Sequence, residues 1–263
     1  MKNTIRCLVS SKENKNTLQI FLFFDTILRL GKKVQVRQMN EKINILNIEL
    51  YQTSAKAAMQ KVVQYMESDS INTVEIITMD MLLKGKDMPG WKEAVESLNL
   101  VLPGETEILE AAGVREKTLL RDTAGLVFLK MFLRYIQRNK KRVFLVAQSE
   151  TELLEMESAI REHDRKLILA GRGVLPPDGA GIEQVINAVN GAETDCIFSL
   201  LPSPEQELLI QRNSALLNAR VWFGCGSVLK EIYMKKQKKG KLQRFLRRKV
   251  FRYQVGRQQR SEE

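Results

Sequence analysis

The sequence is poor in the residues that metal and nucleophilic sites need. It has one histidine, His163, so a Ser-His-Asp triad or a multi-histidine metal site would have to be built on that residue. His163 lies between Glu162 and Asp164 at a predicted helix end, which favours a capping or surface role. The three cysteines have no close pair and no zinc-ligand spacing. We therefore expect no disulfide scaffold, no metal site and a reducing, cytoplasmic setting.

Several further classes of protein are excluded by what is scarce. Six prolines and 15 glycines in 263 residues exclude a collagen-like or Pro/Gly-rich disordered chain. No apolar run reaches the roughly 18 residues that span a bilayer. Residues 18–30 are apolar, but Asp25 and Arg29 interrupt them, which leaves a buried helix or a membrane-surface segment as readings. The sequence also lacks G-x-G-x-x-G and P-loop motifs, so a dinucleotide or Walker-type site is not expected.

Positive charge is concentrated at the C-terminus. The chain has a net charge of +11, and residues 235–263 carry +10 of it. The body before residue 235 is therefore nearly neutral, and its charge gives no support for an extended nucleic-acid groove.

The middle of the chain alternates between predicted strands and helices. This pattern predicts an α/β, Rossmann-like fold with a mainly parallel sheet and flanking helices. The predicted strands are Ile43–Ile48, Thr73–Thr78, Leu98–Leu102, Arg142–Val146, Lys166–Ala170, Asp195–Leu201 and Ala219–Gly224. The predicted helices are Thr53–Met66, Thr123–Arg138, Glu150–Glu162, Ile182–Asn190 and Pro204–Asn213, with a loop over Gly171–Gly181.

Ligands of such folds bind at the carboxyl ends of the strands, where several polar or glycine-rich segments lie. Each segment has a functional and a structural reading. Thr78 and Asp80 could hold a sugar hydroxyl or cap a helix. Glu105 and Glu107 could supply a general base, or they could be acids near the N-terminus of a helix that Thr106 caps. Ser203, Pro204 and Gln206 fit a capping box, or a helix start that binds phosphate or a uracil-like group. Gly224 and Gly226 fit a tight turn or a close approach of backbone to ligand.

The C-terminal segment predicts an amphipathic helix. Leu242, Phe245, Leu246, Val250 and Tyr253 share one helical face, and basic residues surround it. The pattern favours a helix on an anionic membrane, with a helix docked on the body and a nucleic-acid tail as alternatives.

The order of these segments resembles the WecG/TagA/CpsF family of bacterial glycosyltransferases, from about Lys42 to Tyr253. The similar segments are INILNIELYQTSAKAAMQKV, ITMDML, LNLVLPGETEIL, LLPSPEQE, RVWFGCGS and the basic tail. Thr78, Pro204, Gln206, Glu207, Gly224 and Gly226 match family motifs. Asp80 replaces an Asn, Glu205 replaces a Lys, and Gly104 stands where the family has the Asp regarded as its general base.

The resemblance implies an inverting transfer of an N-acetylhexosamine-type sugar from a UDP-sugar to a polyprenyl-diphosphate-linked acceptor, in cell-envelope polysaccharide synthesis. It implies a peripheral location on the inner face of the membrane, no cofactor or metal, and possible self-association. Thr78, Asp80, Gly104, Pro204, Gln206, Glu207, Gly224 and Gly226 would bind substrate, and Glu105 or Glu107 would replace the missing base. The basic residues Arg244, Arg247, Arg248 and Arg252 would engage anionic lipid or the acceptor diphosphate.

Three functions follow as hypotheses. The first is this glycosyltransferase, and the second is an inactive family member that binds or scaffolds another transferase, as Gly104 and Glu205 would favour. Nucleic-acid binding rests on the tail alone. The expected organisation is an N-terminal segment over 1–41, a transferase-like domain over 42–232 and a basic membrane-binding appendage over 233–263.

Overall fold

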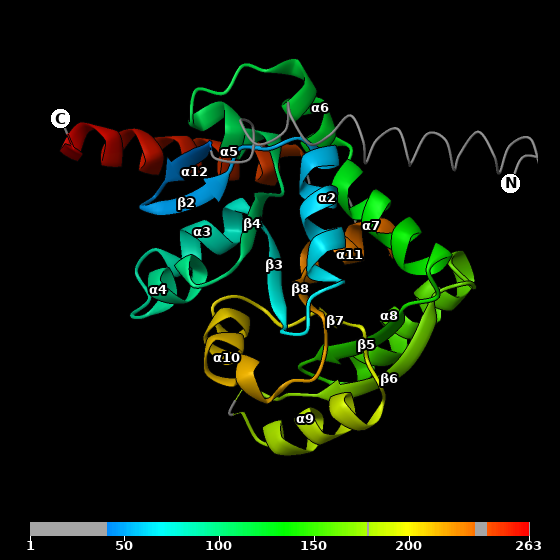
Figure 1. Ribbon diagram of the computed structural model, residues 1–263. Helices are drawn as coiled ribbons and strands as arrows, with labels where there is room; N and C mark the ends of the chain where they lie inside the picture. Colours follow the sequence, from blue (N-terminus) through cyan, green and yellow to red (C-terminus); the bar gives the residue numbers. More distant parts are fainter. Residues whose placement is uncertain (1–40, 178, 235–240, 263) are drawn as a thin grey trace, which may run out of the picture. The chain divides into compact units, whose positions relative to one another are not determined.

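The fold is built on a six-stranded parallel sheet (Figure 1). A computed structural model describes residues 41–177, 179–234 and 241–262. The strand order is β4-β3-β8-β7-β5-β6. The strands are β3 (Asn72–Ile77), β4 (Leu100–Pro103), β5 (Arg142–Ala147), β6 (Ile168–Val174), β7 (Cys196–Ser199) and β8 (Val221–Gly224). The sheet confirms the predicted α/β class, while the apolar segment 18–30 lies outside the described residues.

Helices cover both faces of the sheet, so the strands read as nearly continuous apolar runs. On β5, Val143 and Leu145 face one apolar cluster and Phe144 faces another. The first cluster lies under α2 (Ala55–Tyr65), α7 (Val127–Arg138), α8 (Glu150–His163) and α11 (Gly226–Tyr233). The second lies under α9 (Ile182–Gly191) and α10 (Glu205–Asn213).

The strand predicted over Ile43–Ile48 is instead half of a hairpin. β1 (Lys42–Ile45) pairs antiparallel with β2 (Ile48–Tyr51), and Ile45 lies opposite Ile48. Leu46 and Asn47 form the turn with φ of 53° and 64°, the left-handed geometry of a two-residue hairpin. The prediction was wrong because leucine rarely adopts this conformation and gave no turn signal.

The loop predicted from Gly171 also begins too early, because β6 continues to Val174. Gly171 and Gly173 lie inside this strand, where β5 passes closely. A Cβ on Gly171 would lie 2.7 Å from the ring of Phe144. Here glycine permits close packing and does not mark a turn.

Several helix boundaries also differ from the predictions. The helix predicted over Thr123–Arg138 is two helices, α6 (Lys117–Ala124) and α7, because Gly125 ends the first and Leu126 has a φ of 47°. The helix predicted to begin at Thr53, as its N-cap, begins instead at Ala55, and Ser54 is the N-cap of α2. The short elements α3 (Met79–Gly85), α4 (Trp91–Glu96), α5 (Thr106–Ala111), η2 (Ser214–Leu216) and α11 had not been predicted as separate elements.

The C-terminal helix α12 (Lys241–Glu262) exists as predicted, and it is docked on the body. Phe251 and Val255 are 0% and 3% exposed, and they join an apolar cluster with the β1–β2 hairpin, α3, α4 and α5. Four residues of the predicted apolar stripe face away from this contact: Phe245, Leu246, Val250 and Tyr253 are 51%, 52%, 51% and 64% exposed. The side chain of the fifth, Leu242, lies outside the described part of the chain. The helix therefore has two apolar faces, and the buried one had not been predicted. None of the helices in the described ranges is long and apolar enough to cross a membrane.

Candidate functional site

The carboxyl ends of β3 and β4 place their polar residues side by side. The two strands pair in parallel, and the N–H of Gly104 donates to the carbonyl oxygen of Ile77 over 2.8 Å. Thr78 follows β3 and is the N-cap of α3, since its hydroxyl accepts from the N–H of Met81 over 3.4 Å. Thr78 thus caps a helix, the structural alternative given for it, and Asp80 lies in the first turn of the same helix.

Gly104 has no room for a side chain. A Cβ at this position would lie 2.8 Å from Cγ2 of Ile76 and 3.0 Å from the carbonyl oxygen of Ile77. Both contacts are closer than normal packing allows. The backbone of this strand end is therefore fitted to glycine, and any carboxylate that acts here must come from a neighbouring residue.

The two candidate bases, Glu105 and Glu107, lie on either side of the start of α5. Glu105, not Thr106, occupies the N-cap position, and its Oε2 accepts from the N–H of Met79 over 2.7 Å. Glu107 is 8% exposed, and the hydroxyl of Thr106 donates to its Oε2 over 3.1 Å. Glu105 thus links the end of β4 to the start of α3.

Arginines of α12 pair with these carboxylates. Arg247 donates to Asp80 over 2.9 Å and also to Glu105. Burial lowers the pKa of Arg247, but the charges of Glu105 and Asp80 outweigh this and hold the pKa above its usual value. The Nε of Arg247 is buried and has no partner among the described groups. The structure thus brings together Arg247, Asp80 and Glu105, whose sequence positions are far apart.

Two further ion pairs extend along the same helix. Arg248 pairs with Glu107, and Arg252 pairs with Glu110 over 3.1 Å. The side chains of Arg247, Arg248 and Arg252 are 22%, 47% and 61% exposed, so solvent access rises along the row. We call Arg247, Arg248, Arg252 and their four carboxylate partners the α12 ladder. The side chain of Arg244 lies outside the described part of the chain.

A second acidic cluster lies between β3 and α10. Glu75 of β3 and Glu207 of α10 are 2% and 0% exposed. Gln206 lies beside them and donates from Nε2 to Oε1 of Glu75 over 2.8 Å. Gln206 Oε1 and both oxygens of Glu207 have no hydrogen-bond partner among the described groups. No cation balances this cluster in the described structure, unlike the α12 ladder.

Burial raises the pKa of Glu75 well above its ordinary value, and the nearby carboxylate of Glu207 raises it further. A hydrogen bond between two carboxyl groups needs a proton on one of them. We infer that a proton on Glu75 supplies the donor that Glu207 otherwise lacks. Sequence reasoning missed Glu75, although a lone carboxylate inside the run TVEIIT of a sheet covered on both faces is a usable signal.

The predicted capping box at α10 is wrong. Pro204 is the N-cap of α10, without a side-chain hydrogen bond. The hydroxyl of Ser203 instead accepts from the indole N–H of Trp91 over 2.9 Å, and Gln206 turns inward to Glu75. Tertiary partners have replaced the local cap that the spacing suggested.

The glycines after β8 allow close packing. A Cβ on Gly224 would lie 3.1 Å from Gln206 Oε1 and 3.2 Å from Cγ of Glu75, and one on Gly226 would lie 3.0 Å from the backbone of Leu200. Gly226 is the first residue of α11, so the segment is a strand-to-helix junction and not a free turn. In this arrangement the two glycines meet protein atoms.

One polar residue near the strand ends had been assigned no role. Asp122 of α6 lines a small cavity of about 40 Å³ beside Pro103, together with Thr53 and Thr123. Its Oδ2 accepts from the N–H of Ala55 at the start of α2, over 3.3 Å. A carboxylate at a helix N-terminus is electrostatically favourable, which gives Asp122 a structural role.

The other reactive side chains in the described ranges, His163, Cys196 and Cys225, have structural surroundings. The ring Nδ1 of His163 lies 2.9 Å from the carbonyl oxygen of Ala159, at the end of α8. Cys196 and Cys225 are buried free thiols, and burial raises the pKa of each. Buried neutral thiols are poor nucleophiles.

The sequence of the chain matches a known family. The model of the "Glycosyl transferase WecG/TagA/CpsF family" matches residues 43–239. The chain belongs to this family. A search of the curated proteins gives no match. The family assignment confirms the resemblance and supports glycosyl transfer in general, while the roles of the individual site residues remain predictions.

Proposed function

We propose that this WecG/TagA/CpsF member moves an N-acetylhexosamine-type sugar from a UDP-sugar to a polyprenyl-diphosphate-linked acceptor, in cell-envelope polysaccharide synthesis. One observation carries the proposal beyond the family assignment. The strand ends where α/β folds bind ligands hold carboxylates, and arginines of a basic helix lie directly on them. Carboxylates that could act as a base thus lie next to arginines that could bind a diphosphate.

The same arginines cannot bind the carboxylates and an acceptor diphosphate fully at the same time. Guanidinium groups bind phosphate oxygens as well as carboxylate oxygens, often through two hydrogen bonds. A diphosphate that binds Arg248 would therefore compete with Glu107. In the proposed reaction, acceptor binding transfers the arginines from carboxylates to phosphates and frees a carboxylate at the strand end.

The exposure of the partner arginine favours Glu107 as the freed base, although the side chain of Glu107 is more buried than that of Glu105, at 11% against 21% exposed. Arg248, the partner of Glu107, is 47% exposed, whereas Arg247, the partner of Glu105, is 22% exposed and also holds Asp80. Glu105 in addition accepts the N–H of Met79. Glu107 would accept the proton of the acceptor hydroxyl as its oxygen attacks the anomeric carbon, and UDP would leave from the opposite face with inversion. Glu105 stays the alternative base.

The donor would occupy the strand ends between the starts of α3 and α10. Thr78 and Asp80 would contact its sugar, and Pro204, Gln206 and Glu207 would form the nucleotide side. Since Gln206 and Glu207 are buried, they would shape this side from below unless they turn outward. Gly104, Gly224 and Gly226 would contribute indirectly, because protein atoms fill the space beside each of them and they allow the strand ends to pack closely under the donor. No cofactor or metal enters the proposed reaction.

The exposed stripe on α12 would hold the protein on the membrane. Phe245, Leu246, Val250 and Tyr253 point away from the docked face, and the arginines and lysines of the helix would attract an anionic surface. The proposed location is the cytoplasmic face of the cell membrane, with possible self-association. The nearly neutral body makes nucleic acid an unsuitable partner.

The test is a calorimetric titration of the full-length protein with UDP-N-acetylmannosamine, UDP-N-acetylglucosamine and UDP-glucose. The same samples are then assayed for UDP release with a polyprenyl-diphosphate-sugar analogue. Binding of a donor followed by acceptor-dependent UDP release is the expected result. No binding of any of the three donors would contradict the proposal.

A second function is favoured by a specific observation. Gly104 has no space for the carboxylate that the family carries there, and both candidate replacements are ion-paired. Glu205, exposed in the first turn of α10, adds a negative charge where the family has a lysine. An inactive member that scaffolds another transferase would fit these facts. It predicts no UDP release with any acceptor, even where a donor binds.

A further inference from the structure

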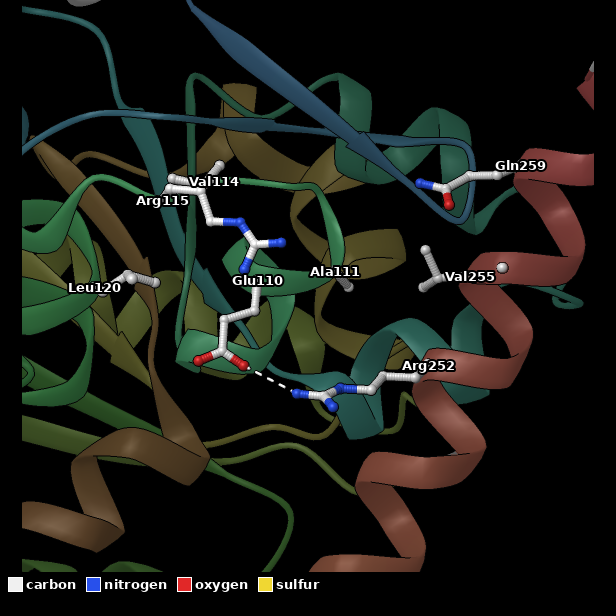
Figure 2. A pocket seen from close by; sticks show the side chains of 9 residues that line it. Glu110, Ala111, Val114, Arg115, Leu120, Arg252, Val255 and Gln259 are labelled. Atoms are coloured by element: carbon white, nitrogen blue, oxygen red, sulfur yellow. Dashed lines mark hydrogen bonds and ion pairs between the residues drawn. The ribbon is translucent and has the colours of Figure 1, made fainter.

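A pocket of about 400 Å³ lies between α5, α6 and α12, away from the strand ends (Figure 2). Its size is in the range of small-molecule sites. The body side is formed by the end of α5 and the segment that follows it, and the opposite side by α12. The pocket thus exists because α12 docks across this part of the body.

The pocket wall has two chemical parts. One part is an apolar surface formed by Ala111, Val114, Leu120 and Val255. Of these, Val114 and Val255 are only 7% and 3% exposed. Arg115 and Arg252 lie on opposite sides in Figure 2, with the carboxylate of Glu110 paired to Arg252 across the pocket. Two guanidinium groups against one carboxylate leave the wall with a net positive charge.

Both arginines are available to a ligand. Arg115 is exposed and makes no hydrogen bond or ion pair within the described residues. Arg252 is paired with Glu110, but the two side chains are 61% and 40% exposed. Ion pairs this exposed contribute little, so an anion with more oxygens can replace the carboxylate at small cost.

We propose that this pocket binds an amphiphile with a phosphate head and a single apolar chain. Arg115 and Arg252 would hold the head, and the wall of Ala111, Val114, Leu120 and Val255 would cover the chain. Such a ligand could come from a membrane lipid or from a lipid-linked acceptor, which share this chemistry. The site rests in part on the proposed function, because Arg252 belongs there to the membrane and acceptor groups.

Gly256 gives a way to close the pocket without disturbing its walls. A Cβ on Gly256 would meet no atom within 4 Å, so a leucine there has open space. Leucine also favours a helix more than glycine does, so α12 is expected to stay folded. Gly191, at the end of α9 and equally open, offers the same substitution far from the pocket as a control.

The experiment is a calorimetric titration of the full-length protein with octyl phosphate below its micelle concentration, without nucleotide. We expect saturable binding that hexyl phosphate weakens by about tenfold, because each buried methylene adds to affinity. Gly256→Leu and Arg115→Gln should each weaken binding at least tenfold. Gly191→Leu and Lys117→Gln, a neighbouring exposed change of charge, should leave it unchanged.

Three results would overturn the site. Inorganic phosphate that binds as well as octyl phosphate would show a plain anion site, and octyl glucoside that binds equally would show an uncharged one. Undiminished binding by Gly256→Leu would place the amphiphile elsewhere. Binding to vesicles with anionic lipid is compared with binding to octyl diphosphate. Preference for the vesicles indicates a membrane lipid as the natural ligand, and preference for octyl diphosphate indicates a lipid-linked acceptor. None of these measurements uses UDP-sugar turnover. A failure of the transferase proposal can therefore be distinguished from a failure of the pocket proposal.

Discussion

The two acidic clusters at this edge of the sheet differ in what compensates their charge. Under α12, the side chains of Asp80, Glu105 and Glu107 are 40%, 21% and 11% exposed, and each is paired with an arginine. Under α10, Glu75 and Glu207 are almost fully buried, and the amide of Gln206 donates to Glu75. A carboxylate next to a displaceable cation can be released to react. For the buried pair we infer instead that one carboxyl group keeps a proton, because burial and the second carboxylate both disfavour its charged form.

The largest expected effect comes from loosening α12. Phe251→Ala should lower the free energy of unfolding by about 3 kcal/mol, because a buried ring is lost and a cavity remains. If α12 detaches before the body unfolds, trypsin should cut at the arginines of α12 sooner in Phe251→Ala than in wild type. Urea unfolding measures the loss of stability, and timed proteolysis measures the cutting. Tyr253→Ala on the exposed face is the control, and an equal loss there would contradict the docked arrangement.

Removing Arg247, the most buried arginine of the α12 ladder, should lower stability less than Phe251→Ala. Arg247→Met keeps an apolar side chain but leaves Asp80 and Glu105 without their cation. We expect a loss of about 1 to 2 kcal/mol, since the ion pairs are only partly shielded from water. Urea unfolding at low salt and at 1 M salt measures this loss, which salt should reduce. Arg257→Met, an exposed arginine without an ion pair in the described ranges, should change stability little. An equal loss there would argue against the ladder.

The cluster under α10 should make stability depend on pH. The pKa of Glu75 is raised on folding, so the folded protein holds a proton that the unfolded chain loses above pH 4.5. The free energy of unfolding should therefore fall as pH rises from 4.5 through the raised pKa. Glu75→Gln should flatten this slope and add about 1 kcal/mol at pH 8. Unfolding from pH 5 to 8 measures it, with exposed Glu93→Gln as control. A wild-type slope kept in Glu75→Gln would refute the shared proton.

The smallest effect on stability should come from the outer face of α12. Leu246→Ser should change the free energy of unfolding by less than about 0.5 kcal/mol, because the side chain is half exposed. Binding to vesicles that contain anionic lipid should fall several-fold, as apolar contact with the membrane is lost. Co-sedimentation with such vesicles measures it, and undiminished binding would argue against this face as the membrane contact.

The sequence allowed the sheet to be predicted because its strands carry strong local signals. Runs such as Thr73–Thr78 and Arg142–Val146 are rich in β-branched and aromatic residues, and the observed strands fall within one residue of both. The β1–β2 hairpin and the break at Leu126 depend on left-handed backbone at leucine, for which the sequence gives no signal.

The candidate site was predictable only in its parts. Position after a strand identified Asp80, Glu105 and Glu107, and the helical stripe identified α12. Their pairing could not be foreseen, because Arg247 and Glu105 are 142 residues apart and only the fold brings them together. Local rules also suggested a capping box at Ser203 that tertiary contacts override, and they gave no sign that Phe251 and Val255 make a second, buried face of α12.

The most direct test measures acceptor-dependent UDP release by three matched variants, Glu105→Gln, Glu107→Gln and Glu110→Gln. Each removes one carboxylate that pairs with α12, but only the first two lie at the strand ends. We predict that Glu107→Gln loses at least about 100-fold in turnover, as expected for a general base, while Glu110→Gln stays within about twofold. A loss in Glu105→Gln alone would move the base to Glu105. Undiminished turnover in both Glu105→Gln and Glu107→Gln would contradict a catalytic role for the carboxylates under α12.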